Sequence, residues 1–433
     1  MVAQNNMIFY YVFIFFVKRQ IKTVKKYCYY SCLLYRFLIL KERHPLITEK
    51  LFKIGLLFGI KQIINNCEKF KVVKDFNYNI VYCIESNQLT NNITPNIVNL
   101  GIMKSHLCYT TLPPRLICKF KDVCVRPNSS FIYFSDGENK SLVIDKLKYK
   151  TNIKSTIAEF RYHNDDNFYH VPIVQDFLEC KDAVSFMGHY SNHFGHFLIE
   201  YLEKFDHLYQ IPVDLTELNI LVNEQIDGNI LDLILLNQKK FGFKILNVPS
   251  SKEVKVANLY TIDPISIVTD GANYSSITDK IFRVGTQQFF SNFQSDVCFG
   301  FATKLFLTRR GLRSMVNIEE VECYFKAQGY RIIDDCHEMS IKEKRSLFGK
   351  ASFVVGPAGS AFFNCIWCPR NVKILNFINY EIAYDNCLQN MLSEEAEIYH
   401  LAGKEINYKF YNSDYHIELD EIIHYSKELG FTS

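Results

Sequence analysis

The chain has 433 residues, of which 48% are hydrophobic and 22% are charged, and its formal net charge is +3. This length and apolar content predict a globular protein with enough core for two domains. The nearly balanced charge, without a recognised nucleic-acid motif, argues against a nucleic-acid partner.

Positive charge is concentrated at the amino end. Residues 1–64 contain eleven lysines and arginines but two glutamates, so this segment carries a net charge of about +9. Three apolar stretches lie within it, at residues 7–17, 27–40 and 51–64, and each is shorter than the ~20 residues that a membrane-spanning helix needs. We expect residues 1–75 to form a basic, apolar helical extension. It lies on an anionic membrane surface or packs on the body of the protein.

The fourteen cysteines are scattered and lack the spacing of a structural zinc site. They indicate reduced thiols and therefore a cytoplasmic protein, peripheral on the inner face of a membrane. A secretory-pathway location is the alternative, because sequons occur at Asn92, Asn128, Asn139 and Asn273.

The first half of the chain reads as a mixture of strands and helices. Short apolar runs between turns at residues 106–150 predict a β-meander. Four elements then follow in strand–helix order, at residues 183–187, 192–209, 219–222 and 230–241. This alternation predicts a layered α/β domain over residues 76–290.

The second half repeats the alternation. Strands are expected at residues 304–308, 330–333, 352–355 and 372–377. Asn317 and Glu320 predict a capping box at the helix after the first strand, and Ser340 opens another helix. Four strands with helical crossovers predict a Rossmann-like unit over residues 291–400, followed by a C-terminal tail at 401–433.

Two features meet at the carboxyl ends of these strands, where ligands bind in such sheets. Arg309 and Arg310 follow the first strand, and the third strand runs into a turn that contains Gly356, Gly359 and Ser360. Glycines let a backbone approach a phosphate, a helix N-terminus favours an anion, and arginine offers paired donors to a diphosphate. Each feature alone is also compatible with a plain tight turn or a solvated pair. The G-x-G-x-x-G spacing that a dehydrogenase would show is missing.

Another candidate site lies on the helix expected at residues 192–209. One face of that helix carries four polar residues, His193, His196, Glu200 and Glu203. A histidine backed by a carboxylate at i+4 is a candidate general base or sugar-hydroxyl ligand. The alternative is a surface face that is stabilised by i,i+4 pairing. The H-E-x-x-H spacing of a metal site is absent from the sequence, so we expect no metal here.

Taken in this order, the motifs resemble those of family 61 glycosyltransferases. They stand at residues 195–200 (GHFLIE), 308–310 (TRR), 317–320 (NIEE) and 356–364 (GPAGSAFFN), and the resemblance covers about residues 106–380. It implies a GT-B-like architecture of two facing Rossmann-like domains. It also implies inverting transfer of a hexosyl, pentosyl or N-acetylhexosaminyl group from a nucleotide-sugar, without a D-x-D metal site or another cofactor.

The resemblance also implies residue roles. His196, oriented by Glu200, would be the catalytic base, or else a sugar ligand that leaves Glu200 or another carboxylate as the base. A UDP-linked donor would be held by six residues, Arg309, Arg310, Gly356, Gly359, Ser360 and Asn364. The acceptor would be a glycan or a lipid-linked glycan, and the domain over residues 76–290 would bind it.

Two positions depart from the family's pattern. Many members have a histidine where this chain has Ala358, and an acidic residue where Asn376 stands. From the resemblance as a whole we expect an inverting glycosyltransferase of surface polysaccharide synthesis, such as capsule or lipopolysaccharide. The alternative is a noncatalytic relative that binds a nucleotide-sugar or a glycan.

Overall fold

The protein is described from a computed structural model. The described residues are 67–73, 79–85, 88–93, 97–100, 107–112, 115–129, 132–136, 139–143, 168–172, 176–188, 190–270, 278–282, 285–294, 303–334, 336–379, 387–407 and 413–433. The membrane-surface segment expected at residues 1–64 lies outside them. Nowhere in the described ranges is a helix both long and apolar enough to cross a bilayer.

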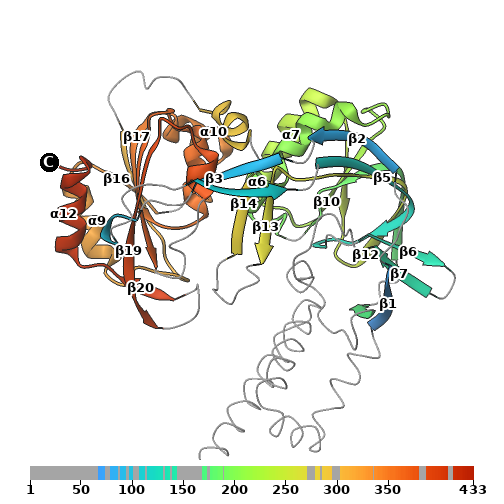
Figure 1. The fold of residues 1–433 in the computed structure, drawn as a ribbon, viewed down its shortest axis with the longest axis horizontal. Helices are drawn as coiled ribbons and strands as arrows, with labels where there is room; N and C mark the ends of the chain where they lie inside the picture. The colour runs from blue at the N-terminus through green and yellow to red at the C-terminus, as the bar shows by residue number, and fades with distance from the viewer. Residues whose placement is uncertain are drawn as a thin grey trace, which may run out of the picture.

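Two sheets lie side by side, the first drawn mainly in blue to yellow and the second in orange and red (Figure 1). Two hairpins lie between them. One pairs β3 (Gln88–Ile93) with β4 (Leu107–Leu112), and the other pairs β13 (Ser266–Asp270) with β14 (Thr278–Phe282). The molecule is therefore a mixed α/β protein with two sheets, as the strand–helix pattern predicts.

The first sheet joins a parallel part to an antiparallel part. Its order in the described chain is β11-β10-β9-β12-β5-β6-β7-β1-β8, and β2 also pairs with β5. The strands are β1 (Cys67–Val73), β2 (Asn79–Glu85), β5 (Arg115–Val125), β6 (Ile132–Asp136), β7 (Asn139–Val143), β8 (Phe168–Pro172), β9 (Asp176–Ser185), β10 (Asn219–Asn223), β11 (Lys244–Val248) and β12 (Lys252–Ile262). Strands β11, β10, β9 and β12 run parallel, whereas β12, β5, β6 and β7 are antiparallel neighbours. The meander is confirmed at β5 to β7, and only the parallel part of this half resembles a Rossmann-like sheet.

The helix expected at 192–209 is divided in the structure. An α-helix, α6 (Phe194–Glu200), ends at Tyr201, and a 3-10 helix, η2 (Leu202–Gln210), follows. Glu203 is buried, where it accepts a hydrogen bond of 2.8 Å from Arg115 Nη1 and contacts His207. The expectation that Glu203 shares a face with His196 is therefore wrong, because the helix changes type between them. The helix expected at 230–241 is confirmed as α7 (Gly228–Phe241).

The second sheet has the order β16-β15-β17-β18-β19-β20. Its strands are β15 (Thr303–Leu307), β16 (Arg331–Ile333), β17 (Ala351–Pro357), β18 (Lys373–Asn379), β19 (Glu397–Asn407) and β20 (Asp414–His416), parallel except for β20. The strands that follow β15 lie on its two sides, first β16 and then β17. This order is that of a Rossmann-like unit, and its ligand crevice is expected between the carboxyl ends of β15 and β17.

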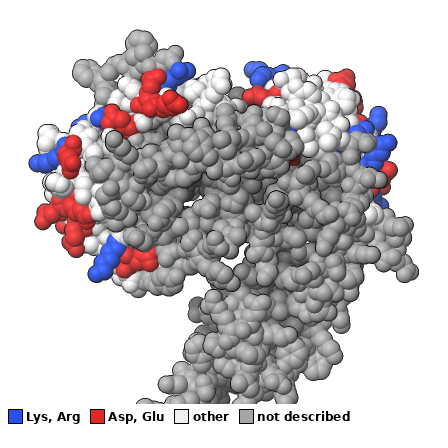
Figure 2. Space-filling view, viewed as in Figure 1, with Lys and Arg blue, Asp and Glu red and all other residues white. Residues whose placement is uncertain are grey.

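Helices cover both faces of the second sheet. They are α8 (Thr286–Ser291), α9 (Ile318–Ala327), α10 (Ile341–Phe348), η3 (Ser360–Trp367), α11 (Cys387–Met391) and α12 (Leu419–Glu428), together with the 3-10 turn η1 (Val98–Leu100). Residues 401–433, expected as a tail, contribute the end of β19, all of β20 and α12 to this sheet and its core. Figure 2 shows acidic and basic side chains interspersed on the outer surface of this lobe.

The two capping boxes have different outcomes. Ser340 and Glu343 form theirs at α10, as the sequence predicts. Asn317 precedes α9 but makes no side-chain cap, because its Nδ2 donates instead to the carbonyl of Ile417, 2.9 Å away. That predicted box is therefore wrong, since a tertiary partner on the segment before α12 takes the asparagine side chain.

One hydrophobic cluster belongs to both halves. It includes Val184 and Phe197 from the first half, and Val354, Phe362 and Trp367 from the second. Burial of apolar side chains contributes about 1.5–3 kcal/mol for each large residue, so this cluster holds the two sheets together. Four helical elements meet around it: α6 contacts η3 and α7, and α10 contacts the same two.

A substitution at Gly356 can test how closely β15 and β17 pair. Its φ is +150°, and a Cβ there would lie 2.1 Å from the carbonyl oxygen of Leu307. We expect Gly356→Ala to lower the free energy of unfolding by about 2–3 kcal/mol, because paired backbone cannot move aside as a side chain can. Urea unfolding followed by circular dichroism measures the change. Gly228→Ala is the control, since nothing lies within 4 Å of its Cβ position, and equal stabilities of the two variants would contradict the prediction.

Candidate functional site

The turn after β17 is held on two sides. The backbone N–H of Ala358 donates to the carbonyl of Phe377 on β18, at 2.7 Å. The carbonyl of Ala358 accepts a hydrogen bond of 2.8 Å from Arg309 Nη1. The turn and the arginine after β15 therefore come together, as expected from the parallel strands that precede them.

The missing side chain of Gly359 makes room for this arginine. A Cβ at Gly359 would lie 2.3 Å from Arg309 Nη1. Arg309 Nε also donates to the carbonyl of Leu312 at 2.8 Å, so the guanidinium is fixed against the turn. Burial and, to a lesser degree, the neighbouring charge of Arg313 together lower the pKa of Arg309 to about 10. At neutral pH Arg309 is therefore a cation in direct contact with the glycine turn.

Donors are also available at the start of η3. Ser360 is exposed as the first residue of this 3-10 helix. In the part of the chain that the structure describes, the backbone N–H groups of Gly359, Ser360 and Ala361 donate to no protein acceptor. A turn with several unpaired N–H groups is the usual form of an anion-binding nest.

Arg310 and Asn364 have protein partners of their own. Arg310 Nη2 lies 2.9 Å from Glu322 Oε2 and 3.8 Å from Asp334 Oδ1, and about half of its side chain is exposed. Asn364 is buried, and its Nδ2 donates to the carbonyl of Ala361 at 2.9 Å. The structure thus places Arg309, Gly356, Gly359 and Ser360 at the turn, while Arg310 pairs with carboxylates and Asn364 stabilises η3.

Arg313 is the residue of this region that motif reasoning misses. It lies in the same loop as Arg309, and its charge is one of the causes of the lowered pKa of Arg309. The sequence R-R-G-L-R at residues 309–313 contains a third arginine after the strand, which could have pointed to Arg313. Spacing alone, however, does not say which of the three arginines lies near the turn.

The second group of candidate residues lies on α6. His196 Nδ1 is 2.6 Å from Glu200 Oε1, and both side chains are half-buried. Because a carboxylate only accepts, this contact holds a hydrogen on Nδ1 and leaves the lone pair of Nε2 available. This tautomer is the one that a general base requires.

Aromatic neighbours surround His196. The ring of Tyr190 stacks on its imidazole with a centroid distance of 4.6 Å, and lies edge-on to His193 at 5.3 Å. Burial lowers the pKa of His193, and the nearby His196 lowers it further. Both effects favour the neutral form of His193 beside the His196–Glu200 pair.

A network of amides fixes the loop before α6. Asn223 at the end of β10 donates through Nδ2 to Ser191 Oγ at 2.9 Å and to Asn192 Oδ1 at 3.1 Å. Asn223 Oδ1 accepts from the backbone N–H of Asn128 at 2.8 Å. These bonds join the loops after β5, β9 and β10, so the residues ahead of His193 rest on three strands of the sheet.

Both groups of candidate residues lie at one contact between the halves. A Cβ at Gly195 would lie 2.5 Å from the ring of Phe363 on η3. The helix with His196 and Glu200 therefore packs directly on the helix that begins at the glycine turn. Gly195 is the glycine of the G-H-F motif. Glycine is required there because α6 and η3 approach each other too closely for a side chain.

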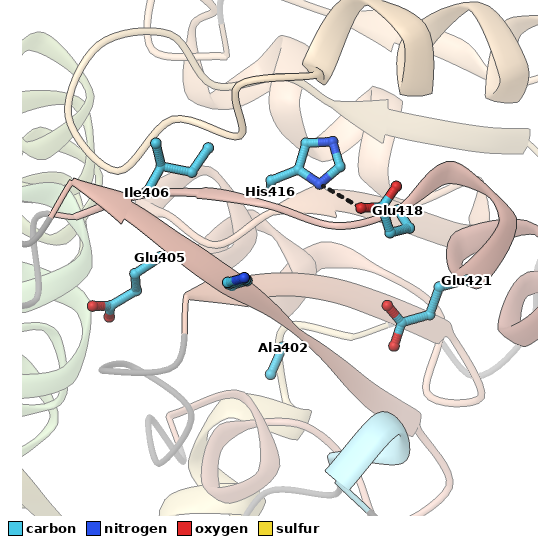
Figure 3. A pocket seen from close by; sticks show the side chains of 7 residues that line it. Ala402, Glu405, Ile406, His416, Glu418 and Glu421 are labelled. Carbon is cyan, nitrogen blue, oxygen red and sulfur yellow. Dashed lines mark ion pairs between the residues drawn. The ribbon is translucent and has the colours of Figure 1, made fainter.

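One pocket opens at the carboxyl end of β19 (Figure 3). It has a volume of about 620 Å³ and is lined by Ala402, Lys404, Glu405, Ile406, His416, Glu418 and Glu421. His416 Nδ1 lies 3.6 Å from Glu418 Oε1. Three carboxylates at its rim would repel a diphosphate, so we do not place the phosphates here. No group of three metal-ligating side chains gathers within the described ranges.

Residues 194–375 match the family model described as Glycosyltransferase 61. The match begins at the first residue of α6 and ends inside β18, so it contains the His196–Glu200 pair, Arg309 and the glycine turn. It supports a family 61 glycosyltransferase domain in this part of the chain. No curated protein matches the chain.

The pKa of His193 provides a test of the site geometry. We expect it below the ordinary value of 6.5, and we expect His196→Gln to raise it because one like charge is removed while burial remains. Histidine NMR titration measures both values. A folded state that disfavours protonated His193 should also lose stability as pH falls below about 6.5. An unchanged His193 pKa in His196→Gln would contradict the proximity of the two rings.

Proposed function

We propose that the protein is an inverting glycosyltransferase that moves a sugar from a nucleotide-sugar to a glycan or lipid-linked acceptor in surface polysaccharide synthesis, such as capsule or lipopolysaccharide. One observation carries the proposal: α6 with its His196–Glu200 pair packs on η3, which begins at the turn held by Arg309. The family match over residues 194–375 supports glycosyl transfer as the activity. In this proposal the two halves act as the two domains of a GT-B-like enzyme.

On the donor side, Arg309 would bind the diphosphate of a UDP-linked sugar. Its guanidinium offers paired N–H donors, and the unpaired backbone N–H groups of Gly359 and Ser360 lie in the same turn. Negative charge grows on the diphosphate as the bond from the anomeric carbon breaks. Preorganised cationic and N–H donors stabilise that charge, and in our proposal they do so without a metal.

On the acceptor side, Nε2 of His196 would take the proton of the acceptor hydroxyl. Glu200 keeps the hydrogen on Nδ1 and stabilises the imidazolium that forms. The hydroxyl oxygen forms its bond to the anomeric carbon on the face opposite the diphosphate, which departs with the electron pair of the broken C–O bond. The configuration at that carbon is therefore inverted, and the proton remains on His196.

A donor screen tests the activity. We expect one of a set of UDP- and GDP-sugars to be consumed by the full chain in the presence of a chelator, with the product detected by mass spectrometry. Loss of the base should reduce turnover by about 10²–10⁴-fold in His196→Ala and leave donor affinity nearly unchanged. Arg309→Ala should instead weaken donor binding.

A matched histidine is available as the control. His424 forms an i,i+4 pair with Glu428 on α12, at 3.3 Å, and this helix packs in a different hydrophobic cluster from η3. His424→Ala should leave turnover unchanged. Unchanged turnover in His196→Ala would remove the base assignment, and donor binding without transfer to any acceptor would support the noncatalytic alternative.

We also propose that the protein is cytoplasmic and peripheral on the inner membrane face, which rests on the basic residues 1–64. Five basic residues follow the first apolar stretch, namely Lys18, Arg19, Lys22, Lys25 and Lys26. A full-length variant with glutamine at all five should lose cosedimentation with anionic vesicles, because each charge contributes about 1 kcal/mol near such a surface. Neutral vesicles are the control. Equal sedimentation of both proteins with anionic vesicles would contradict the proposal.

A further inference from the structure

The loop from β15 to α9 holds Arg313 in an unusual backbone conformation. Its φ is +60°, a region that arginine seldom occupies. The next residue fixes it there: the N–H of Ser314 donates to Asp414 Oδ1 at 3.1 Å, and the carbonyl of Ser314 accepts from the N–H of Tyr415 at 3.1 Å. Backbone strain of about 1–3 kcal/mol persists where the surroundings enforce it, and such residues cluster at ligand sites.

Tyr415 places Arg313 near the glycine turn. Its hydroxyl donates to the carbonyl of Phe377 at 2.9 Å, and the same carbonyl accepts from the N–H of Ala358 in the turn. Burial raises the pKa of Tyr415, and the positive charges of Arg309 and Arg313 both oppose that rise. Through Ser314 and Tyr415, the loop that carries Arg313 is therefore joined to the carbonyl of Phe377, to which the glycine turn is also bonded.

These two arginines lack the compensation that Arg310 has. In the described part of the chain, neither Arg309 nor Arg313 has a carboxylate oxygen within 4.0 Å. Arg313 Nε is buried without a hydrogen-bond partner among the described residues. Two like charges at close range repel each other, and a buried N–H without an acceptor costs about 1–3 kcal/mol. An anion with two charges would relieve both costs at once.

A purely structural Arg313 is the simpler alternative, and it fits less well. A structural arginine normally satisfies its N–H groups with carbonyls or carboxylates. Asp414, the acidic neighbour of this loop, accepts from the backbone of Ser314 through Oδ1. The loop therefore fixes Arg313 through main-chain hydrogen bonds, and the guanidinium of Arg313 remains available to bind a ligand.

We propose that Arg313 is the second arginine of the donor site, and that Arg309 and Arg313 together make this site select a diphosphate over a monophosphate. This inference rests on the proposed function. Arg310, which the sequence places beside Arg309, then serves to hold the loop to α9 through Glu322.

The test measures binding of UDP, inorganic pyrophosphate and orthophosphate to the full chain by calorimetry. Arg313→Gly removes the guanidinium. Glycine adopts a φ of +60° without strain, so the loop can keep its conformation in this variant. We expect its pyrophosphate affinity to fall at least about 10-fold, and its orthophosphate affinity to fall by no more than about 3-fold. Arg313→Lys should recover part of the pyrophosphate affinity, since one positive charge returns without the paired donors.

A matched control comes from the same sheet. Arg331 is exposed at the amino end of β16, the edge opposite the turn, so Arg331→Ala should bind both anions as the wild type does. Thermal unfolding of every variant checks that the fold is kept. Arg310→Ala is measured in parallel, and an effect larger than that of Arg313→Gly would overturn the inference.

The outcomes separate the inference from the proposed function. If the wild type binds neither pyrophosphate nor UDP, the donor site itself is wrong. If the wild type binds and Arg309→Ala loses binding while Arg313→Gly does not, Arg313 has no part in a site that otherwise stands. Equal losses for pyrophosphate and orthophosphate in Arg313→Gly would overturn the selection of a diphosphate.

Discussion

The contact between Gly195 and the ring of Phe363 is the constraint on which the candidate site depends. A side chain at Gly195 would overlap this ring, so α6 and η3 can lie together because glycine occupies that position. The hydrophobic cluster shared by the two sheets holds both helices in place around the contact. A helix with a histidine–glutamate pair and a turn with an arginine thereby become neighbours, although more than 150 residues separate them in the chain.

Some arginines have a carboxylate partner and others have none, and this difference indicates where a ligand could bind. Buried Arg115 pairs with Glu203, and buried Arg126 pairs with Glu253. The exposed Arg310 has Glu322. Unpaired buried charge is costly, so a fold that supplies carboxylates for these three and none for Arg309 and Arg313 within the described residues leaves charge available for a ligand.

Local patterns predicted what local interactions decide. The strands of the second sheet and the Ser340 box follow from hydrophobic alternation and from a bond between residues three apart. His196 and Glu200 meet because they are four apart on a helix. Predictions failed where distant residues competed: Ile417 takes the side chain of Asn317, and Arg115 binds Glu203 inside the core. Hydrophobic periodicity cannot predict such partners, because these residues come into contact only when the sheets pack.

The sequence by itself determined the residue types and spacings of the site: a histidine with its carboxylate, a glycine turn after a buried strand, and arginines after its neighbour. Parallel strands with helical crossovers then bring the last two together, because the carboxyl ends of such strands share one edge. Only the tertiary structure decided which arginines remain uncompensated, since that depends on carboxylates from α9 and on the loop pinned to β20. It also decided that α6 packs on η3, because close approach of two helices depends on the shapes of both surfaces at once.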